Sequence, residues 1–153
     1  AIVGDILHSR VALSNIYGLI TMGAEVMLCG PSNLIPVHLK ELGVEISYKI
    51  NEALDWADAV NVLRIQRERM GKSLVPSVRE YREMFGITSK KLSLHKKEIV
   101  VMHPGPMNRG VEIDGDVADG DQAIILDQVL NGVASRMSIL FLLCGGKNSD
   151  GES

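Results

Sequence analysis

Short runs of β-branched and other apolar residues alternate along the chain with segments in which apolar residues recur every three or four positions. The first pattern predicts buried β-strands, and the second predicts amphipathic α-helices. Glycine, or glycine followed by proline, ends several of these segments, which is typical of element boundaries. We expect strands at residues 1–5, 24–30, 44–49, 58–63 and 97–103, and helices at 8–23, 33–43, 51–57 and 121–146.

The regular alternation of strand and helix predicts right-handed crossovers and a parallel sheet with helices on both faces. The expected fold class is α/β, with a doubly wound, Rossmann-like parallel sheet of about five strands. We assign residues 1–146 to this one domain and expect residues 147–153 to be a disordered tail. Ligands of such sheets bind outside the carboxyl ends of the strands, so the segments that directly follow strands are the candidates for function.

The expected final helix carries apolar residues on more than one face. A helix that is apolar nearly all round is buried on all sides in a folded protein. Two explanations stay open, namely that loops of the same domain cover the helix or that a further domain or subunit packs against it. The apolar residues are Ile124, Ile125, Leu126, Val129, Leu130, Val133, Met137, Leu140, Phe141 and Leu142.

Composition narrows the class of function. The chain has 153 residues and a formal net charge of −3, so it lacks the basic excess of a nucleic-acid-binding domain. No secretion signal or uninterrupted membrane-spanning stretch is recognised, and we expect Cys29 and Cys144 to be reduced, buried thiols. No spacing of Cys, His, Asp and Glu is typical of a metal site, and no Ser-His-acid triad is visible. These features predict a cytoplasmic protein that binds neither nucleic acid nor a membrane nor a metal ion.

Basic residues follow two of the expected strands. Arg10 lies where the first helix begins, and the positive helix end and the guanidinium group both favour an anion there. After the fourth strand, Arg64 and Gln66 fall on the same side of an extended segment, where they form a forked donor pair suited to a carboxylate. Structural alternatives stay open, with Arg10 as a surface residue paired to a carboxylate and residues 64–69 as a solvated charged loop.

The segment HPGPMNR, residues 103–109, follows the fifth strand and is poor in hydrogen-bond donors. Pro104 and Pro106 have no N–H, so the turn that they form with Gly105 presents rigid carbonyl groups. Such carbonyls suit a ligand that donates hydrogen bonds, for example an amide group. A tight structural turn is the alternative, and its X-Pro bonds leave a cis peptide open. We expect His103 to make a structural bond to the backbone rather than to act as an acid or base.

Three motifs together, GDILHSRVALSN, LRIQRERM and HPGPMNRGVEI, resemble the C-terminal half of aspartate carbamoyltransferase catalytic chains. The resemblance covers nearly the whole domain, and the third motif is the most specific. The sister ornithine enzymes carry an HCLP pattern in the third motif and an SMG motif in the amino-acid loop. This chain has HPGP and RIQRER at those places, so the resemblance favours aspartate over ornithine as the substrate.

The resemblance implies transfer of the carbamoyl group from carbamoyl phosphate to L-aspartate, which gives N-carbamoyl-L-aspartate and phosphate in pyrimidine synthesis. It implies that basic side chains bind the carboxylates of aspartate and that turn carbonyls hold the carbamoyl NH₂ group, with no cofactor or metal. The implied residues are Arg10, Arg64 and Gln66 for aspartate, and Pro104, Gly105 and Pro106 for carbamoyl phosphate.

The resemblance also implies partners. The family's N-terminal domain, which carries a Ser-Thr-Arg-Thr phosphate-binding loop, has no counterpart in these 153 residues. The complete site of the family lies between the two domains in a homotrimer of full catalytic chains, with regulatory chains or a dihydroorotase left open as further partners. We therefore expect the chain alone to have no transferase activity.

Two other functions are alternatives for such a fold. A nicotinamide-dependent oxidoreductase needs a G-x-G-x-x-G fingerprint and an acidic ribose ligand after the second strand, but this chain has a lone Gly4 and the segment CGPSN there. A non-catalytic amino-acid-binding or regulatory module built from the same domain stays open. Such a module predicts measurable binding of aspartate by the isolated domain.

Overall fold

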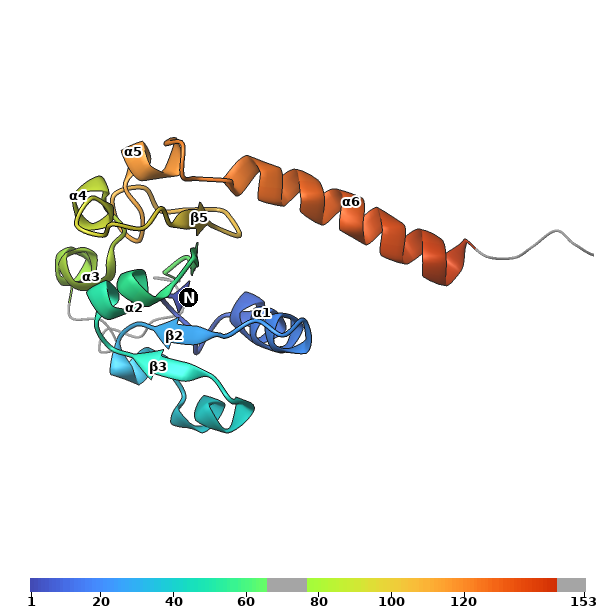
Figure 1. Ribbon diagram of the computed structural model, residues 1–153, viewed down its shortest axis with the longest axis horizontal. Coiled ribbons are helices and arrows are strands. Elements are labelled where there is room, and N and C mark those ends of the chain that lie inside the picture. The colour runs from blue at the N-terminus through green and yellow to red at the C-terminus, as the bar shows by residue number, and fades with distance from the viewer. Residues whose placement is uncertain (66–76, 146–153) are drawn as a thin grey trace, which may run out of the picture.

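The computed structural model describes residues 1–65 and 77–145. Its core is a five-stranded parallel sheet with the strand order β3-β2-β1-β4-β5 (Figure 1). The predicted doubly wound α/β fold is therefore confirmed, and each expected strand is present with tighter bounds. The strands are β1 (Ile2–Val3), β2 (Met27–Cys29), β3 (Glu45–Ser47), β4 (Ala59–Val62) and β5 (Val100–Met102).

Helices cover both faces of the sheet. Neighbouring residues of a strand point to opposite faces, so they contact different helices. Val3 packs with one set of helices, whereas Ile2 packs with the other set. The first face carries α2 (Ile50–Trp56), α3 (Val78–Phe85), α4 (Ser89–Leu92) and α5 (Gly115–Ala118). The second face carries α1 (Arg10–Thr21) and the 3₁₀-helix η2 (Val37–Leu42), and a shorter 3₁₀-helix, η1 (Ser32–Leu34), follows β2.

Two of the expected helices differ from the structure. The single helix expected at 33–43 is wrong, because η1 and η2 take its place. Pro36 separates them, since proline cannot donate the backbone hydrogen bond and disfavours helical geometry in the residue before it. The final helix α6 (Ile125–Cys144) begins later than residue 121, because residues 121–124 form the connection that follows α5.

Helices α3, α4 and α5 were not predicted from the sequence. The N-terminus of α3 carries a clear signal, because the Ser77 hydroxyl accepts a hydrogen bond from the Glu80 N–H at 3.0 Å. Serine followed three residues later by glutamate is a capping-box pattern. Tyr81 and Phe85, one turn apart, are both buried in the hydrophobic cluster on the first face of the sheet, here called the first core. The cap and this pair explain why so polar a segment forms a helix.

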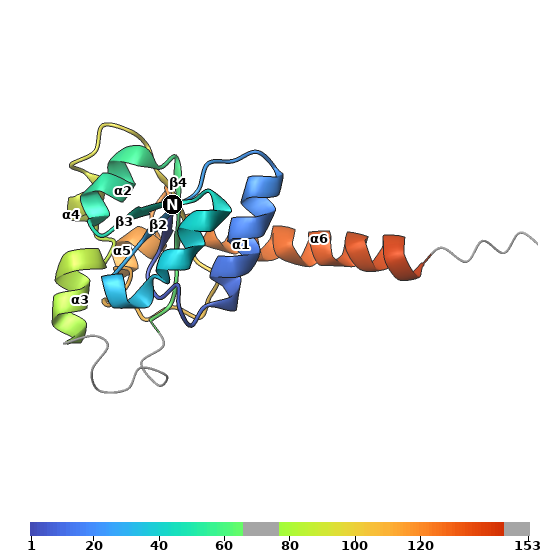
Figure 2. The same cartoon turned by 90° about the horizontal axis from the view of Figure 1, so that it is seen from below.

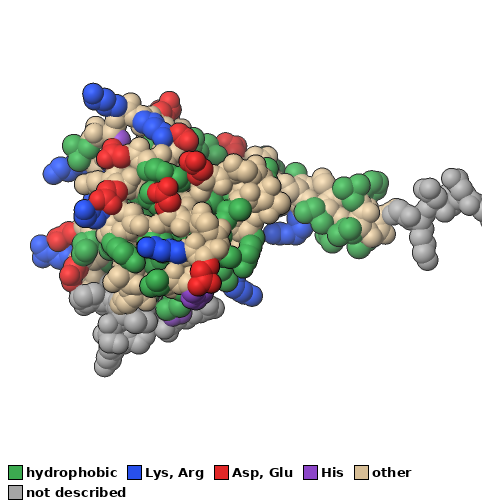
Figure 3. All heavy atoms as spheres, turned by 60° about the horizontal axis from the view of Figure 1, so that its bottom comes forward, with side chains coloured by type: hydrophobic (Ala, Val, Ile, Leu, Met, Phe, Trp, Pro, Cys, Tyr) green, Lys and Arg blue, Asp and Glu red, His purple; other side chains and the backbone are tan. Residues whose placement is uncertain are grey.

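Helix α6 projects away from the sheet as a long arm (Figures 1 and 2). Ile125, at its root, is its one buried residue, whereas Leu126 is 85% exposed. Apolar side chains also lie along the visible face of the arm in Figure 3. The described residues thus leave α6 uncovered, and by length and composition alone it is also apolar enough to cross a membrane, with a mean hydropathy of 1.2.

Candidate functional site

The carboxyl edge of the sheet has a topological switch point between β1 and β4. From β1 the chain builds the sheet outward through β2 and β3, whereas β4 and β5 lie on the other side of β1. Crevices at such switch points are where doubly wound sheets bind ligands. Gly4, directly after β1, has a φ of 127°, and a Cβ there would lie 2.9 Å from the Leu63 carbonyl oxygen. A glycine is therefore required for the two post-strand loops to approach each other.

The loop after β1 presents Arg10. The buried Asp5 carboxylate accepts the His8 N–H at 3.1 Å and also contacts His8 Nδ1 at 2.9 Å, which fixes the turn before α1. The Ser9 hydroxyl then caps the helix by accepting the Ala12 N–H at 3.1 Å. Arg10 is the first residue of α1 and is exposed, so its guanidinium group is accessible to a ligand.

The loop after β4 presents Arg64. This residue is half-buried and follows Leu63, while the next side chain, Ile65, is buried in the first core. The structure therefore separates the two side chains as the expected alternation requires. Gln66 lies outside the described residues, so the forked Arg64–Gln66 pair stays a prediction.

The loop after β5 contains the carbonyl turn. Pro104 is half-buried, whereas Gly105 and Pro106 are exposed. The Gly105–Pro106 bond is the one cis peptide among the described residues. His103 is fully buried, and its Nδ1 accepts the Gly105 N–H at 2.8 Å, which confirms the predicted structural bond to the backbone.

Two further residues hold this loop and were missed by the sequence analysis. Glu112 is fully buried, and its carboxylate accepts hydrogen bonds from the backbone N–H of Asn108 and, at 3.2 Å, from the Asn108 side-chain amide. The same amide donates to the Ile65 carbonyl at 3.2 Å, so the β5 loop is tied to the β4 loop. The available signal was a charged residue between Val111 and Ile113, where an apolar one is usual.

Burial changes the chemistry of two groups near the edge. It raises the pKa of the Tyr81 hydroxyl far above its ordinary value, and the Glu112 carboxylate adds to this effect. Burial also raises the pKa of Cys29 to about 12, so this thiol stays protonated and unreactive at neutral pH. The expectation of two buried thiols is confirmed for Cys29 and wrong for Cys144, which is exposed near the end of α6.

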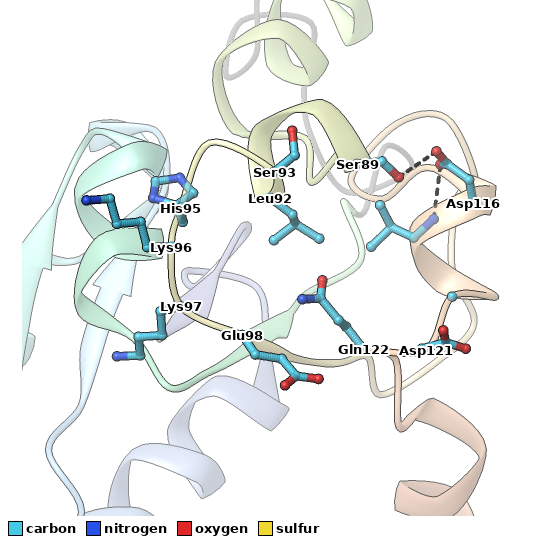
Figure 4. A pocket seen from close by; sticks show the side chains of 12 residues that line it. Ser89, Leu92, Ser93, His95, Lys96, Lys97, Glu98, Asp116, Asp121 and Gln122 are labelled. Carbon is cyan, nitrogen blue, oxygen red and sulfur yellow. Dashed lines mark hydrogen bonds between the residues drawn. The ribbon is translucent and has the colours of Figure 1, made fainter.

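A hollow of about 480 Å³ lies elsewhere, between α4, α5 and the segment before β5 (Figure 4). Its lining mixes Lys96 and Lys97 with Asp116 and Asp121, so no one sign of charge prevails. The Ser89 hydroxyl donates to Asp116 at 2.6 Å and so occupies one of these carboxylates. The hollow flanks the amino end of β5, opposite to the edge that carries Arg10, Arg64 and the carbonyl turn. We therefore place the candidate site at the carboxyl edge, where the structure brings the three loops together.

The fold and this edge define a class, namely a doubly wound α/β domain of the kind that binds small ligands at a switch point. Residues 1–143 match the family model described as aspartate/ornithine carbamoyltransferase, Asp/Orn binding domain. The chain belongs to this family, which confirms the resemblance seen in its motifs.

Curated relatives are similar over nearly all of the chain. An aspartate carbamoyltransferase catalytic subunit of Christiangramia forsetii is 60% identical over 142 residues, which are 93% of this chain and 46% of the relative. One of Gemmatimonas aurantiaca is 57% identical over 146 residues, which are 95% of this chain and 46% of the relative. The chain thus spans about half the length of the curated relatives it matches.

The solved structure of an ornithine carbamoyltransferase from Pyrococcus furiosus also superposes on this chain. The TM-score is 0.76 at 24% identity, and the match covers 95% of this chain and 49% of the other. A likeness at this identity concerns the fold alone. The fold is therefore shared by enzymes named for different amino acids, and side chains must decide between them.

Proposed function

We propose that the chain is the amino-acid-binding half of an aspartate carbamoyltransferase. The reaction transfers the carbamoyl group from carbamoyl phosphate to L-aspartate, as a step of pyrimidine synthesis in the cytoplasm. The observation that carries the proposal is the bond from Asn108 to the Ile65 carbonyl, which joins the carbonyl turn to the loop of Arg64. The carbonyl groups of the turn suit the NH₂ group of a carbamoyl donor, and the cationic Arg64 beside them suits the carboxylates of aspartate, so the two substrates would meet there. The aspartate specificity is supported by the names of the curated relatives.

In this proposal different loops bind the two substrates, aspartate and carbamoyl phosphate. Arg10 and Arg64, with Gln66 beside them, bind the carboxylates of aspartate through charge-assisted hydrogen bonds. Pro104 and Gly105 accept hydrogen bonds from the carbamoyl NH₂ group, and Pro106 lines the carbamoyl phosphate site. The amine nitrogen of aspartate attacks the carbamoyl carbon, the bond from that carbon to the phosphate oxygen breaks, and the departing phosphate takes up the proton that the amine loses. Orientation and electrostatic stabilisation provide the catalysis, without a covalent intermediate on the protein.

The proposal includes a second domain, because the edge offers no phosphate-binding loop among the described residues. The uncovered apolar surface of α6 supports packing against an N-terminal carbamoyl phosphate domain. The proposal also includes assembly of full catalytic chains as a homotrimer, as the family resemblance implies.

A membrane is the rival environment for α6, and its polar residues argue against it. Asp127 lies in the first turn and Arg136 lies past the middle of the helix. A charged residue deep in a bilayer costs roughly 2.5–3.5 kcal/mol even on the mildest scale. Packing against another protein domain leaves such residues room to reach water or a partner, so it is the better account of the exposed surface.

The test is a transferase assay with two proteins, the chain alone and the full catalytic chain that includes the carbamoyl phosphate domain. We expect N-carbamoyl-L-aspartate from the full chain with aspartate, no carbamoyl product with ornithine, and no activity from the 153-residue chain. Product formation with ornithine instead of aspartate, or by the isolated chain, would refute the proposal.

A variant sharpens this test. Arg64→Ala in the full chain should lower kcat/KM for aspartate by about 10- to 100-fold, because it removes charge-assisted hydrogen bonds to the substrate. Arg79→Ala is the matched control, since Arg79 is an exposed arginine on α3 whose described partner is Glu83, one turn away. Equal effects of the two substitutions would contradict the assigned role of Arg64.

A further inference from the structure

The buried carboxylate of Glu112 lies between the carbonyl turn and the loop of Arg64. Resting on the proposed function, we propose that Glu112 is a positioning residue that sets the direction of the substrate-binding carbonyls through His103 and the spacing of the two loops through Asn108. The sequence motif alone assigns it no role, and Glu112 touches no ligand-facing surface, because its side chain is fully buried.

The first connection runs through His103. The Gly105 N–H donates to His103 Nδ1 at 2.8 Å. This N–H shares a planar peptide unit with the Pro104 carbonyl, and in a trans peptide the two groups point in opposite directions. Because the N–H points at the buried imidazole, the Pro104 carbonyl must point away from it. The orientation of His103 therefore fixes the carbonyl proposed to bind the carbamoyl NH₂ group.

The imidazole can serve this purpose in one tautomer only. A backbone N–H can only donate, so Nδ1 must be the acceptor and the ring proton must reside on Nε2. Nε2 is buried, makes no hydrogen bond to any described residue, and faces Glu112 Oε1 at an ion-pair distance of 3.5 Å. A carboxylate at this distance favours the Nε2–H tautomer electrostatically. The His103 N–H itself donates to Gln128 at 3.1 Å, which anchors the backbone beneath the ring.

The second connection runs through Asn108. Glu112 accepts both the backbone N–H and the side-chain amide of this residue. The side-chain amide nitrogen also donates to the Ile65 carbonyl at 3.2 Å. Because Ile65 directly follows Arg64, the carboxylate holds the carbonyl turn and the arginine loop in one network. Both proposed substrate contacts thus depend on a single buried group.

A carboxylate suits this place better than any other side chain. Three N–H donors point toward it: the Asn108 N–H and the Asn108 amide hydrogen-bond to the carboxylate, and the Nε2–H of His103 faces it at 3.5 Å. An ionised carboxylate only accepts hydrogen bonds, whereas the amide of glutamine also donates two. Glutamine has the same shape but would face one of the three donors with a donor of its own. Glu112→Gln therefore changes the network with little change in volume.

The experiment compares Glu112→Gln with Asp119→Asn in the full catalytic chain. Asp119 is an exposed acid that pairs with Arg109, and Arg109 lies in the same loop as Glu112. The change of Asp119 to an amide is therefore a matched control. We expect Glu112→Gln to lower kcat by about 10- to 100-fold and to raise KM for carbamoyl phosphate, while the protein stays folded. The control should stay within about twofold of wild type. Wild-type kinetics for a folded Glu112→Gln protein would overturn the inference.

A second variant separates positioning from mere folding. In His103→Asn the side-chain oxygen can accept the Gly105 N–H near the place of Nδ1, and it needs no tautomer. If Glu112 acts through His103, Glu112→Gln should lower kcat less in the His103→Asn background than in wild type. A strictly multiplicative loss of kcat would overturn the proposed route.

A third readout needs no activity. Nitrogen-15 NMR of labelled histidine reports which ring nitrogen carries the proton, and the chain has only 4 histidines. We expect His103 to carry its proton on Nε2 in wild type and to lose this preference in Glu112→Gln. An unchanged tautomer would overturn the inference. If wild type fails to carbamoylate aspartate, the proposed function falls, and the tautomer still decides the role of Glu112.

Discussion

Two segments after β5 depart from the usual distribution of residues in opposite ways. The loop at residues 103–113 buries polar side chains, with His103 and Glu112 both fully inside. Helix α6 exposes apolar ones, with Leu126 85% and Leu143 79% exposed. A buried polar group is costly unless it is hydrogen-bonded, and a large exposed apolar surface is costly unless something covers it.

The difference lies in where each cost is met. The loop offsets most of this cost internally, because the Glu112 carboxylate accepts two hydrogen bonds from Asn108 and lies 3.5 Å from His103 Nε2. The described part of the chain does not meet it for α6, whose core contact is limited to Ile125. The comparison teaches that an unusual environment points to function in two ways: a hydrogen-bonded buried network supports a candidate site, and an uncovered apolar face supports the proposal of a partner.

The largest expected effect on stability comes from removing the buried carboxylate of the loop. Glu112→Ala in the 153-residue chain leaves the Asn108 N–H without its acceptor and removes the carboxylate that faces the Asn108 amide and His103 Nε2. Each buried group left unsatisfied costs about 1–3 kcal/mol, so we expect the free energy of unfolding to fall by about 3 kcal/mol or more. Urea denaturation monitored by circular dichroism measures it. A loss below about 1 kcal/mol would mean that the loop is no more constrained than the helix.

The next effect tests the helix with two adjacent residues. Ile125→Ala should lower the free energy of unfolding by about 2–4 kcal/mol, because Ile125 is buried against the first core. Leu126→Ala should change it by less than about 0.5 kcal/mol in the chain alone, because that side chain is exposed. In the full catalytic chain, the loss for Leu126→Ala should rise if the second domain covers it. Equal losses at both positions in the isolated chain would break the comparison.

The smallest effect is expected at the surface of the same loop. Arg109 donates hydrogen bonds to Asp119 and lowers the pKa of that carboxyl below its ordinary value of 3.8. A lowered folded-state pKa adds stability that is present above the unfolded value and is lost as the pH falls through the folded one. Asp119→Asn should therefore be slightly less stable than wild type at pH 7, with the gap closing in acid. Thermal melts from about pH 7 to pH 2 measure it, and a gap that widens in acid would contradict this sign.

Much of the scaffold could be predicted from local patterns. The five strands and the parallel order of the sheet follow from apolar runs separated by helical segments, because a parallel strand pair requires a crossover. The helix expected at 33–43 failed at Pro36, whose effect on the backbone outweighs apolar spacing. Helix α3 was missed because its polar surface hides a single buried pair, Tyr81 and Phe85, although Ser77 and Glu80 mark its start.

The candidate site divides in the same way. Arg10, Arg64 and the carbonyl turn could be selected from the sequence because each directly follows a strand. Glu112 could not, since its importance comes from donors that the fold brings to it from Asn108 and His103. Hydrogen bonds between residues that are close in space leave little trace in the periodicity of the chain.

By itself the sequence determined the fold class and the family and selected the candidate segments for the site, because strand runs, turn residues and motifs are local properties of the chain. Only the tertiary structure decided that Glu112 is buried beneath the carbonyl turn, that Asn108 ties this turn to the loop of Arg64, and that α6 stands uncovered. The physical reason is that burial and hydrogen-bond satisfaction depend on what surrounds a residue in three dimensions. An apolar helix has the same sequence pattern whether or not a neighbouring domain covers it.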